Sequence, residues 1–233
     1  MQEIFDSYVE NSFGEEKQAV FKFKQFEYNY KKYFPKDKDA QVLDIGIGRG
    51  EMLTCFKEWG YKNYLGIDIS PSTVRFCKSI GLNCELVKDS SKFLQENQNK
   101  YDLITLIDVL EHIPREHTVS FLKDLRSALK RGGVLIIQVP NLQAPDGQLH
   151  MYNDITHMVG FIEHSLQQVL ITAGFKEFHF QGFEEFVDNR FKTKVKKILR
   201  SILWKKTRFE RLINGNLNPK ILNPVFSAIV RKD

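Results

Sequence analysis

The stretch Val42-Leu43-Asp44-Ile45-Gly46-Ile47-Gly48-Arg49-Gly50-Glu51 decides the fold of this chain. An apolar run leads into a carboxylate and a turn with three glycines, and a helical pattern follows directly. Gly46, Gly48 and Gly50 let the backbone turn tightly and approach a flat ligand that side chains would keep away. The stretch therefore predicts a strand, a ligand-binding loop and a helix.

The acids around this loop indicate which ligand it binds. The dinucleotide fingerprint G-x-G-x-x-G would need a glycine at position 51, where this chain has Glu51. Asp44 and Glu51 would repel a pyrophosphate at short range, because all of these groups are anionic. They suit a ligand with cationic centres, and S-adenosylmethionine carries a sulfonium and an ammonium. We therefore predict a site for this methyl donor.

Polar residues follow the next predicted strands, at 63–68, 84–87, 101–108 and 134–139. In an open α/β sheet the ligand lies outside the carboxyl ends of the strands. Asp68 lies about 20 residues past the loop, where it can bind the two ribose hydroxyls. Asp89 can accept from the adenine amino group, with a helix cap as its alternative role. The predicted cofactor-binding residues are Asp44, Gly46, Gly48, Gly50, Asp68, Ile69, Asp89, Ser90, Ile107 and Asp108.

The alternation of short apolar strands with helical segments predicts an α/β fold. We expect a doubly wound, Rossmann-like architecture with a mostly parallel seven-stranded sheet, whose final strand at 224–231 is antiparallel. An aromatic-rich helical cap precedes it, either as a layer packed on the sheet or as a cover over donor and acceptor. The predicted units are the N-terminal cap at 1–38, the donor-binding core at 39–182 and 223–233, and a basic helical insertion at 183–222.

Length and cysteine use are those of a globular protein in a reducing compartment. The chain has 233 residues, enough for one domain with a sizeable core. The acidic start at 1–6 predicts no signal peptide, and no apolar run approaches the ~20 residues that cross a bilayer. Cys55, Cys77 and Cys84 fall on predicted helix and strand positions and indicate reduced core thiols. We therefore predict a cytoplasmic location.

Basic charge is concentrated between Arg190 and Arg211, a segment with ten Lys or Arg and one acid. The segment sums to +9, which leaves −4 of the formal +5 for the rest of the chain. An apolar stripe at helical spacing runs through it, formed by Val195, Ile198, Leu199, Ile202 and Leu203. Either this stripe packs on the domain, or the helix lies on the anionic inner leaflet of a membrane near a lipid-linked acceptor. An anionic nucleotide-sugar or polysaccharide is a third ligand for the same charge.

The loop and the strand ends together resemble the class I S-adenosylmethionine-dependent methyltransferases, from about residue 8 to the C-terminus. Within that superfamily the chain is similar to bacterial sugar methyltransferases of capsule and lipopolysaccharide gene clusters. The segments that carry this narrower similarity are Tyr8-Val9-Glu10 with Phe13-Gly14, Asp44 to Glu51, Glu111-His112-Ile113-Pro114, Val139-Pro140-Asn141 and Asn153-Asp154-Ile155-Thr156-His157. The resemblance implies an O-methyltransferase acting on a sugar or sugar substituent in capsular polysaccharide or lipopolysaccharide biosynthesis.

A sugar hydroxyl is a weak nucleophile, so its proton must leave as the methyl group arrives. The predicted catalytic residues are His157, His112, Asp108, Glu111 and Asp154. His157 is the first candidate for the base, because an unperturbed histidine titrates near neutrality. The alternatives are that His157 is only hydrogen-bonded in a loop and that His112 only shapes the methyl pocket.

A divalent metal such as Mg²⁺ is a further expectation for this cluster. Asp108, Glu111, His112 and His157 offer two carboxylates and two imidazoles, which can bind a hard or borderline cation. The metal could chelate a vicinal diol and lower the pKa of the attacking hydroxyl. The pattern is similar to that of ubiquinone-pathway O-methyltransferases and Hen-type RNA 2′-O-methyltransferases, with Asp108 one methylene shorter than the glutamate found there.

Other acceptors stay open at this point. A prenylated phenol would suit the aromatic cap and the basic helix. An RNA ribose would use the basic segment against phosphates, but the main fold is net acidic and no aromatic and basic platform is evident, which argues against nucleic acid. N-methylation of an amino sugar is a further alternative. The donor chemistry is therefore better specified than the acceptor.

Overall fold

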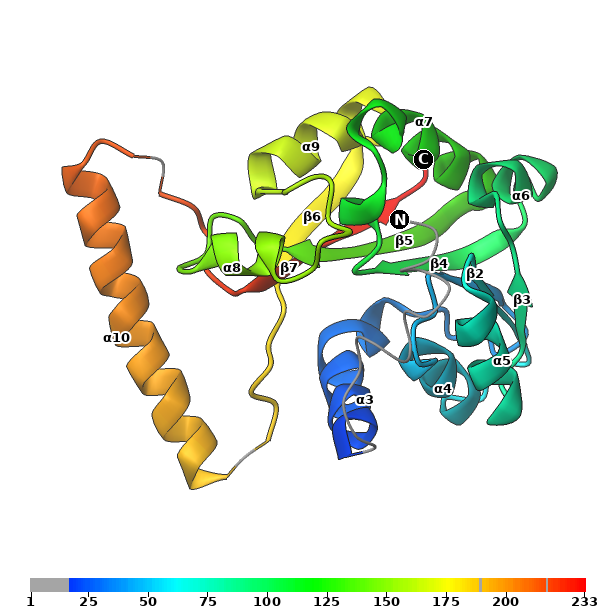
Figure 1. Ribbon diagram of the computed structural model, residues 1–233, viewed down its shortest axis with the longest axis horizontal. Helices are drawn as coiled ribbons and strands as arrows, with labels where there is room; N and C mark the ends of the chain where they lie inside the picture. The colour runs from blue at the N-terminus through cyan, green and yellow to red at the C-terminus, as the bar shows by residue number, and fades with distance from the viewer. Residues whose placement is uncertain (1–16, 189, 217) are drawn as a thin grey trace.

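The computed structural model describes residues 17–188, 190–216 and 218–233 (Figure 1). Its centre is a seven-stranded sheet in the order β3-β2-β1-β4-β5-β7-β6, in which β7 alone is antiparallel to its neighbours. The strands are β1 Gln41–Ile45, β2 Asn63–Asp68, β3 Cys84–Leu86, β4 Tyr101–Ile107, β5 Leu129–Pro140, β6 Glu177–Gly182 and β7 Val225–Arg231. The predicted doubly wound, mostly parallel sheet with an antiparallel last strand is confirmed.

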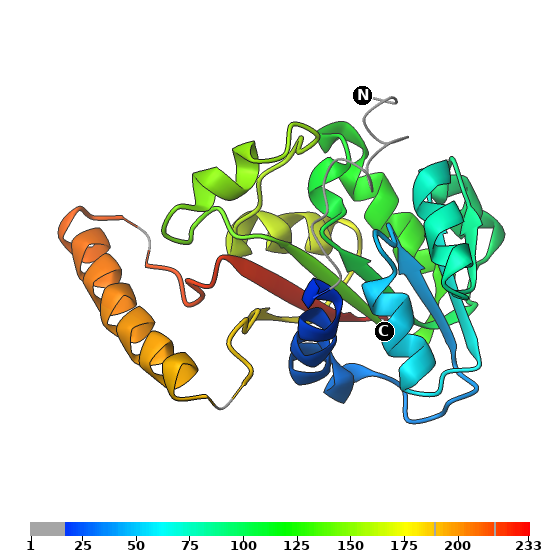
Figure 2. The ribbon, with the colours of Figure 1, turned by 60° about the horizontal axis from the view of Figure 1, so that its bottom comes forward.

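Helices cover both faces of the sheet (Figures 1 and 2). One face carries α3 Lys17–Tyr30, α4 Glu51–Glu58 and α5 Pro71–Ser79, and the other carries α6 Ser90–Glu96, α7 Arg115–Ala128 and α9 Glu163–Thr172. The short elements are η1 Lys31–Tyr33, η2 Leu110–His112 and α8 Gly147–Tyr152, and the long α10 spans Phe191–Ile213. The sheet is therefore the middle of three layers.

Successive side chains of β5 point to opposite faces of the sheet, and both faces are buried, which explains why the strand is a continuous apolar run in the sequence. Leu135 and Ile137 face the core under α7 and α9, whereas Val134 and Ile136 face the core under α3 and α4. Because both faces of a parallel strand are covered, neither set can be polar. The sheet thereby buries two hydrophobic cores.

The N-terminal layer is fixed to the sheet by a buried polar contact. The Tyr30 hydroxyl at the end of α3 lies 2.5 Å from Gln138 Oε1 on β5 and 2.6 Å from Ser227 Oγ on β7. Phe26 and Phe34 pack into the same core. The layer predicted for this part of the chain is present from residue 17 onward, and the part of the prediction that concerns residues 1–16 lies outside the described residues.

The α10 helix stands to one side of these layers, joined to them by the segments at 183–190 and 214–224 (Figures 1 and 2). Among the described helices, none is long and apolar enough to span a bilayer. The predicted amphipathic helix thus exists, while its apolar stripe does not pack on the domain. Its exposed Ile198 and Ile202 point away from the half-buried Arg200 and Trp204.

Candidate active site

The glycine loop between β1 and α4 adopts a conformation that other residues disfavour. Gly46, Gly48 and Gly50 have φ angles of 74°, 50° and 78°, in the left-handed region that glycine enters without steric cost. A Cβ atom on Gly46 would also collide with the Val109 side chain. The loop therefore requires glycine both for its backbone and for the space beside the strand ends.

A cavity of 330 Å³ opens at the carboxyl ends of β1, β2 and β4. This volume is at the lower end of the range for small-molecule sites. Eight of the ten predicted cofactor-binding residues line it, namely Asp44, Gly46, Gly48, Asp68, Ile69, Ser90, Ile107 and Asp108. The topology brings them together because parallel strands end at the same edge of the sheet.

Two predicted cofactor residues lie outside this lining. Gly50 shapes the start of α4, and Asp89 caps α6 by accepting from the backbone N–H of Lys92 at 2.9 Å. The Asp89 side chain is exposed. The structure therefore gives Asp89 the alternative role of a helix cap, and its contact with adenine stays a prediction.

Sequence reasoning missed the contribution of α3 to this cavity. Lys22 and Phe26 line it, and Lys22 Nζ forms an ion pair with Glu51 Oε1 at 3.0 Å. No motif marks these positions. The only signal was the general expectation that the aromatic cap covers the donor.

The carboxylates of the donor cavity sit in a low-dielectric environment. Burial raises the pKa of Asp44 well above its usual value, although Thr105 Oγ1 donates to its Oδ1 at 2.6 Å. Burial also raises the pKa of Asp68, while backbone N–H groups, including that of Ser70 at 2.8 Å, oppose the shift. A buried carboxylate is costly without a compensating partner. Both residues are therefore prepared for a ligand that brings positive charge or hydroxyl donors.

Asp108 is held by a hydrogen-bonded chain that reaches across the sheet. Its φ angle is 54°, so the backbone leaves β4 one residue earlier than the sequence predicts. Gln138 Nε2 donates to both Asp108 carboxylate oxygens at 3.0 Å, and the same amide accepts from Tyr30, which contacts Ser227. The chain fixes the carboxylate at the boundary of the donor cavity.

Glu111 is a buried carboxylate whose oxygens accept no hydrogen bond from the part of the chain that the structure describes. Its side chain lies in η2, is 2% exposed, and neither oxygen has a partner among the described residues. Burial raises its pKa well above the usual value, with Asp108 adding to the shift. His157 Nε2 lies 3.9 Å from Glu111 Oε1. An orphaned carboxylate of this kind is costly and needs an occupant, a proton or a charged partner.

A hydrogen-bonded chain also sets the tautomer of His112. The Thr156 hydroxyl donates to Asp154 Oδ1 at 2.6 Å and lies 2.9 Å from His112 Nδ1. Because the single hydroxyl proton goes to Asp154, Thr156 accepts from Nδ1–H of His112. Burial lowers the pKa of His112. The neutral imidazole therefore keeps an unprotonated Nε2, suited to accept a proton or to bind a metal.

The two histidines stand next to each other at the edge of the donor cavity. The centroids of their rings are 4.7 Å apart, and His112, unlike His157, is among the residues that line the cavity. The Nδ1 atom of His157 contacts the Met151 carbonyl at 3.3 Å. His157, the first candidate for the base from the sequence, therefore does not line the cavity itself. It lies next to His112, which does.

Three of the four predicted metal ligands come together. One ligand atom each from Glu111, His112 and His157 can be chosen so that all lie within 4.8 Å of one another. Asp108 is not among these three residues, and its two carboxylate oxygens accept from Gln138 Nε2. The four-residue set expected from the sequence is therefore corrected to one carboxylate and two imidazoles. The orphaned Glu111 oxygens and the oriented His112 ring fit a divalent cation.

A second cavity of 350 Å³ adjoins the first and shares Lys22, Phe26 and Asp108 with it. Its other walls come from α3, from β5 and β7, and from the segment that follows β6: Gln25, Gln138, Phe183, Glu185, Phe186 and Val225. The Asp108 carboxylate thus lies between the two spaces. Two adjoining cavities can accommodate a donor and an acceptor.

The sequence model of the family described as "Methyltransferase domain" matches residues 19–179, more than half of the chain. A tRNA U34 carboxymethyltransferase of Campylobacter fetus is 32% identical over 126 residues, covering 51% of this chain and 43% of that protein. A ubiquinone biosynthesis O-methyltransferase of Colwellia psychrerythraea is 26% identical over 109 residues, covering 44% and 43%. In these alignments the chain spans less than half the length of either relative.

Solved structures share the fold. A SAM-dependent methyltransferase from Archaeoglobus fulgidus has a TM-score of 0.69 at 23% identity, with 98% of each chain covered. The 1,6-didemethyltoxoflavin-N1-methyltransferase of Burkholderia thailandensis, solved with S-adenosylhomocysteine bound, has a TM-score of 0.56 at 17% identity, with 93% of this chain and 79% of that chain covered. At these identities the likeness concerns the architecture alone.

Proposed function

The chain belongs to the methyltransferase domain family, and on that premise we propose that it is an S-adenosylmethionine-dependent O-methyltransferase of a sugar or sugar substituent. One observation carries the proposal: His112, whose Nδ1 lies 2.9 Å from the Thr156 hydroxyl, lines the same cavity as the glycine loop and Asp68. A donor site and a proton acceptor therefore meet in one space, as methyl transfer to a hydroxyl requires.

On the donor side, the chain offers a residue for each part of the ligand. Asp68 would accept from the ribose hydroxyls, and Asp44 and Glu51 would face the cationic amino-acid part of the donor. The sulfonium already activates the methyl carbon, so these residues mainly supply alignment. Holding two reactants in line can contribute ~7–11 kcal/mol.

On the acceptor side, His112 Nε2 would take the hydroxyl proton while Thr156 and Asp154 keep the ring in place. As an alternative to this base role, the His112, His157 and Glu111 cluster fits a divalent cation, which would take His112 Nε2 as a ligand. When bound, such a cation would act as a Lewis acid and lower the pKa of an acceptor hydroxyl. The buried Glu111 carboxylate would then gain the partner that it lacks within the described chain.

The sugar acceptor is supported by the Asn153-Asp154-Ile155-Thr156-His157 element, one of the segments that resemble the sugar methyltransferases of envelope gene clusters. In this chain the element has a chemical role, because Thr156 orients His112. A prenylated phenol is the second candidate acceptor. It is favoured by matched relatives named as ubiquinone biosynthesis O-methyltransferases.

The test uses purified protein and methyl-labelled S-adenosylmethionine with four pools from cells that lack this protein: nucleotide sugars, lipid-linked glycans, quinone lipids and RNA. We expect label in a sugar pool with the unaltered chain and not with His112→Gln. Label confined to the quinone lipids or to RNA would overturn the sugar assignment while leaving the methyl transfer intact. Activity that survives exhaustive EDTA treatment and ignores added magnesium or manganese would exclude a metal role.

A further inference from the structure

The α10 helix presents a polar face to the protein and an apolar face to solvent. The residues turned toward the body are the buried Thr193 and the half-buried Arg200, Trp204 and Arg211. They recur at intervals of seven, four and seven residues, the spacing of one side of a helix. An ordinary surface helix does the reverse and turns its apolar stripe toward the core.

The outward stripe runs without a break from Val195 to Leu203, and Lys206 separates this part from Phe209. Ile198, Leu199, Ile202 and Leu203 are 61%, 55%, 58% and 61% exposed, and Phe209 continues the stripe. No helix or strand of the described chain packs along it. A contiguous exposed apolar surface of this kind marks an interaction site.

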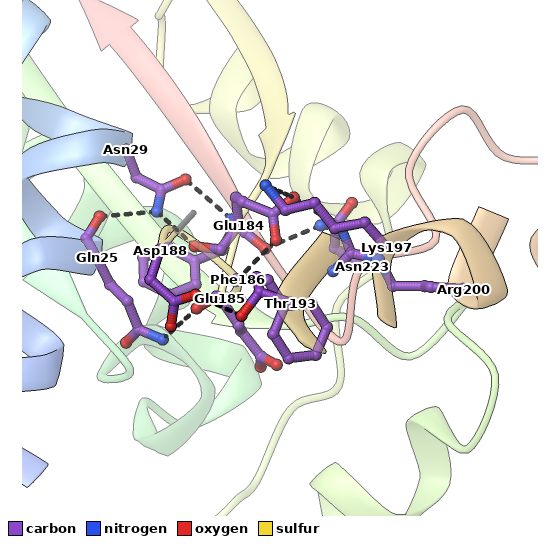
Figure 3. Close-up of polar contacts among 11 residues, drawn as sticks. Gln25, Asn29, Glu184, Glu185, Phe186, Asp188, Thr193, Lys197, Arg200 and Asn223 are labelled. Atoms are coloured by element: carbon purple, nitrogen blue, oxygen red, sulfur yellow. Dashed lines mark hydrogen bonds and ion pairs between the residues drawn. The ribbon is translucent and has the colours of Figure 1, made fainter. Parts of the chain in front are cut away.

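Charged contacts hold the helix in this orientation (Figure 3). Glu184 Oε2 pairs with Arg200 Nη2 at 2.7 Å and lies 3.9 Å from Lys197 Nζ. At the other end, Arg211 Nη2 donates to the Gln143 carbonyl at 2.5 Å. Rotating the stripe inward would break these contacts and carry the cationic side chains outward. The exposed stripe is therefore the arrangement that the charges favour.

The segment that follows β6, which contains Glu184 and Glu185, ties α10 to the walls of the second cavity. Asn29 on α3 donates to the Glu184 carbonyl at 3.0 Å and accepts from its N–H at 2.9 Å, while Gln25 donates to the Glu185 carbonyl at 3.0 Å (Figure 3). Glu185 and Gln25 line that cavity. A surface that binds α10 would thus be connected by a short, hydrogen-bonded segment to the candidate acceptor side.

We propose that the outward face of α10 docks in the plane of an anionic phospholipid bilayer. The segment from Arg190 to Arg211 carries +9, and three of its lysines flank the stripe, Lys194 and Lys205 on one side and Lys196 on the other. An interfacial helix has this form, with apolar residues in the acyl boundary and lysines reaching the headgroups.

The charge also distinguishes the bilayer from a second copy of this chain. Two α10 helices packed stripe to stripe would bring two strongly cationic segments together, and like charges at short range repel. An anionic surface neutralises the same charges. The proposal goes beyond the proposed methyl transfer and holds whichever acceptor that reaction uses.

The experiment is vesicle flotation with the purified full chain. We expect binding to vesicles of phosphatidylcholine mixed with phosphatidylglycerol, none to phosphatidylcholine alone, and a marked loss of binding at high salt. The variant Ile198→Ser with Ile202→Ser should lower the partition coefficient at least ~10-fold. Its matched control is Ile80→Ser with Ile171→Ser, two exposed isoleucines away from α10, which should bind as the unaltered chain does.

Absence of binding of the unaltered chain to the anionic vesicles would overturn the proposal. Equal binding by the Ile198→Ser, Ile202→Ser variant would overturn it as well, because the stripe would then play no part. Both positions are exposed, so circular dichroism should show an intact fold. A dimer in sedimentation velocity that this variant abolishes, without vesicle binding by the unaltered chain, would assign the stripe to a second copy instead.

Discussion

At the scale of single residues, Asp68 and Asp89 follow neighbouring strands yet differ in placement. Asp68 lines the donor cavity, whereas the Asp89 side chain caps the N-terminus of α6. Asp68→Asn should weaken S-adenosylmethionine binding about 10- to 100-fold, because a charge-assisted hydrogen bond is lost. Asp89→Asn keeps the cap and should leave the Kd unchanged. Calorimetric titration of both variants provides the comparison, and an equal loss at Asp89 would support its predicted contact with adenine.

The Thr156 hydroxyl is expected to act on catalysis through His112 and not through binding. Thr156→Val removes the acceptor that fixes the Nδ1–H tautomer, so kcat should fall about 10- to 100-fold while the Kd for the donor is unchanged. Thr156→Ser should restore most of the rate. Thr172→Val is the control, since Thr172 lies on the exposed side of α9 and bonds only to the Gln168 carbonyl. A loss of donor binding in Thr156→Val would instead indicate a structural role.

Asp44 is expected to lower the stability of the donor-free protein at neutral and higher pH. Burial raises its pKa, the hydrogen bond from Thr105 opposes the shift, and Glu51 adds to it. A carboxyl with a raised folded-state pKa favours folding below its unfolded pKa, and that contribution is lost as the pH rises through the folded pKa. Asp44→Asn should therefore raise Tm by about 2–4 °C for each kcal/mol recovered.

Thermal unfolding of the donor-free Asp44→Asn variant across pH measures this effect. The gain in Tm over the unaltered chain should be largest at alkaline pH and shrink as the pH falls toward the range where a free carboxyl is protonated. A gain that stays constant with pH would show that the Asp44 charge is not its cause.

At the scale of elements, the glycine loop combines two requirements that a pair of variants separates. Gly46→Ala faces both a positive φ and the Val109 side chain, whereas Gly60→Ala has a φ of 82° with open space around the new methyl group. Each should lose ~1–2 kcal/mol of stability from backbone strain. Only Gly46→Ala should also weaken donor binding, as measured by calorimetry beside urea unfolding. Equal donor affinity in the two variants would contradict a ligand-binding role for the loop.

Elements with strong local signals agree with their sequence-based prediction. The bounds of β2 are those expected, because its apolar run is defined locally. The register of β6 depends instead on its pairing with β7, and Phe175, two residues before β6, belongs to the core. Long-range partners were beyond prediction: Gln138 lies 108 residues from Tyr30, and no spacing rule relates such positions.

The orientation of α10 could not be predicted from the sequence either. Periodicity predicts which residues share a face of a helix, but not which face meets the protein. Here the rule that apolar residues turn inward fails, because Glu184 and two backbone carbonyls attract the cationic side. The candidate metal ligands show the same limit: sequence supplies four candidates, and the distances between ligand atoms leave Glu111, His112 and His157 together without Asp108.

At the scale of the whole molecule, α10 and the two-sided core are separate units of stability, joined by Glu184 near one end of the helix and by hydrogen bonds of Arg208 and Arg211 near the other. The helix contributes to neither hydrophobic core, so it can detach without global unfolding. The half-buried pair of Glu184 with Arg200 contributes on the order of 1 kcal/mol at most. Glu184→Gln should therefore speed trypsin cleavage near Arg190 about fivefold while Tm is unchanged. The exposed Glu177→Gln is the control, and a matching fall in Tm would show that α10 is integral to the core.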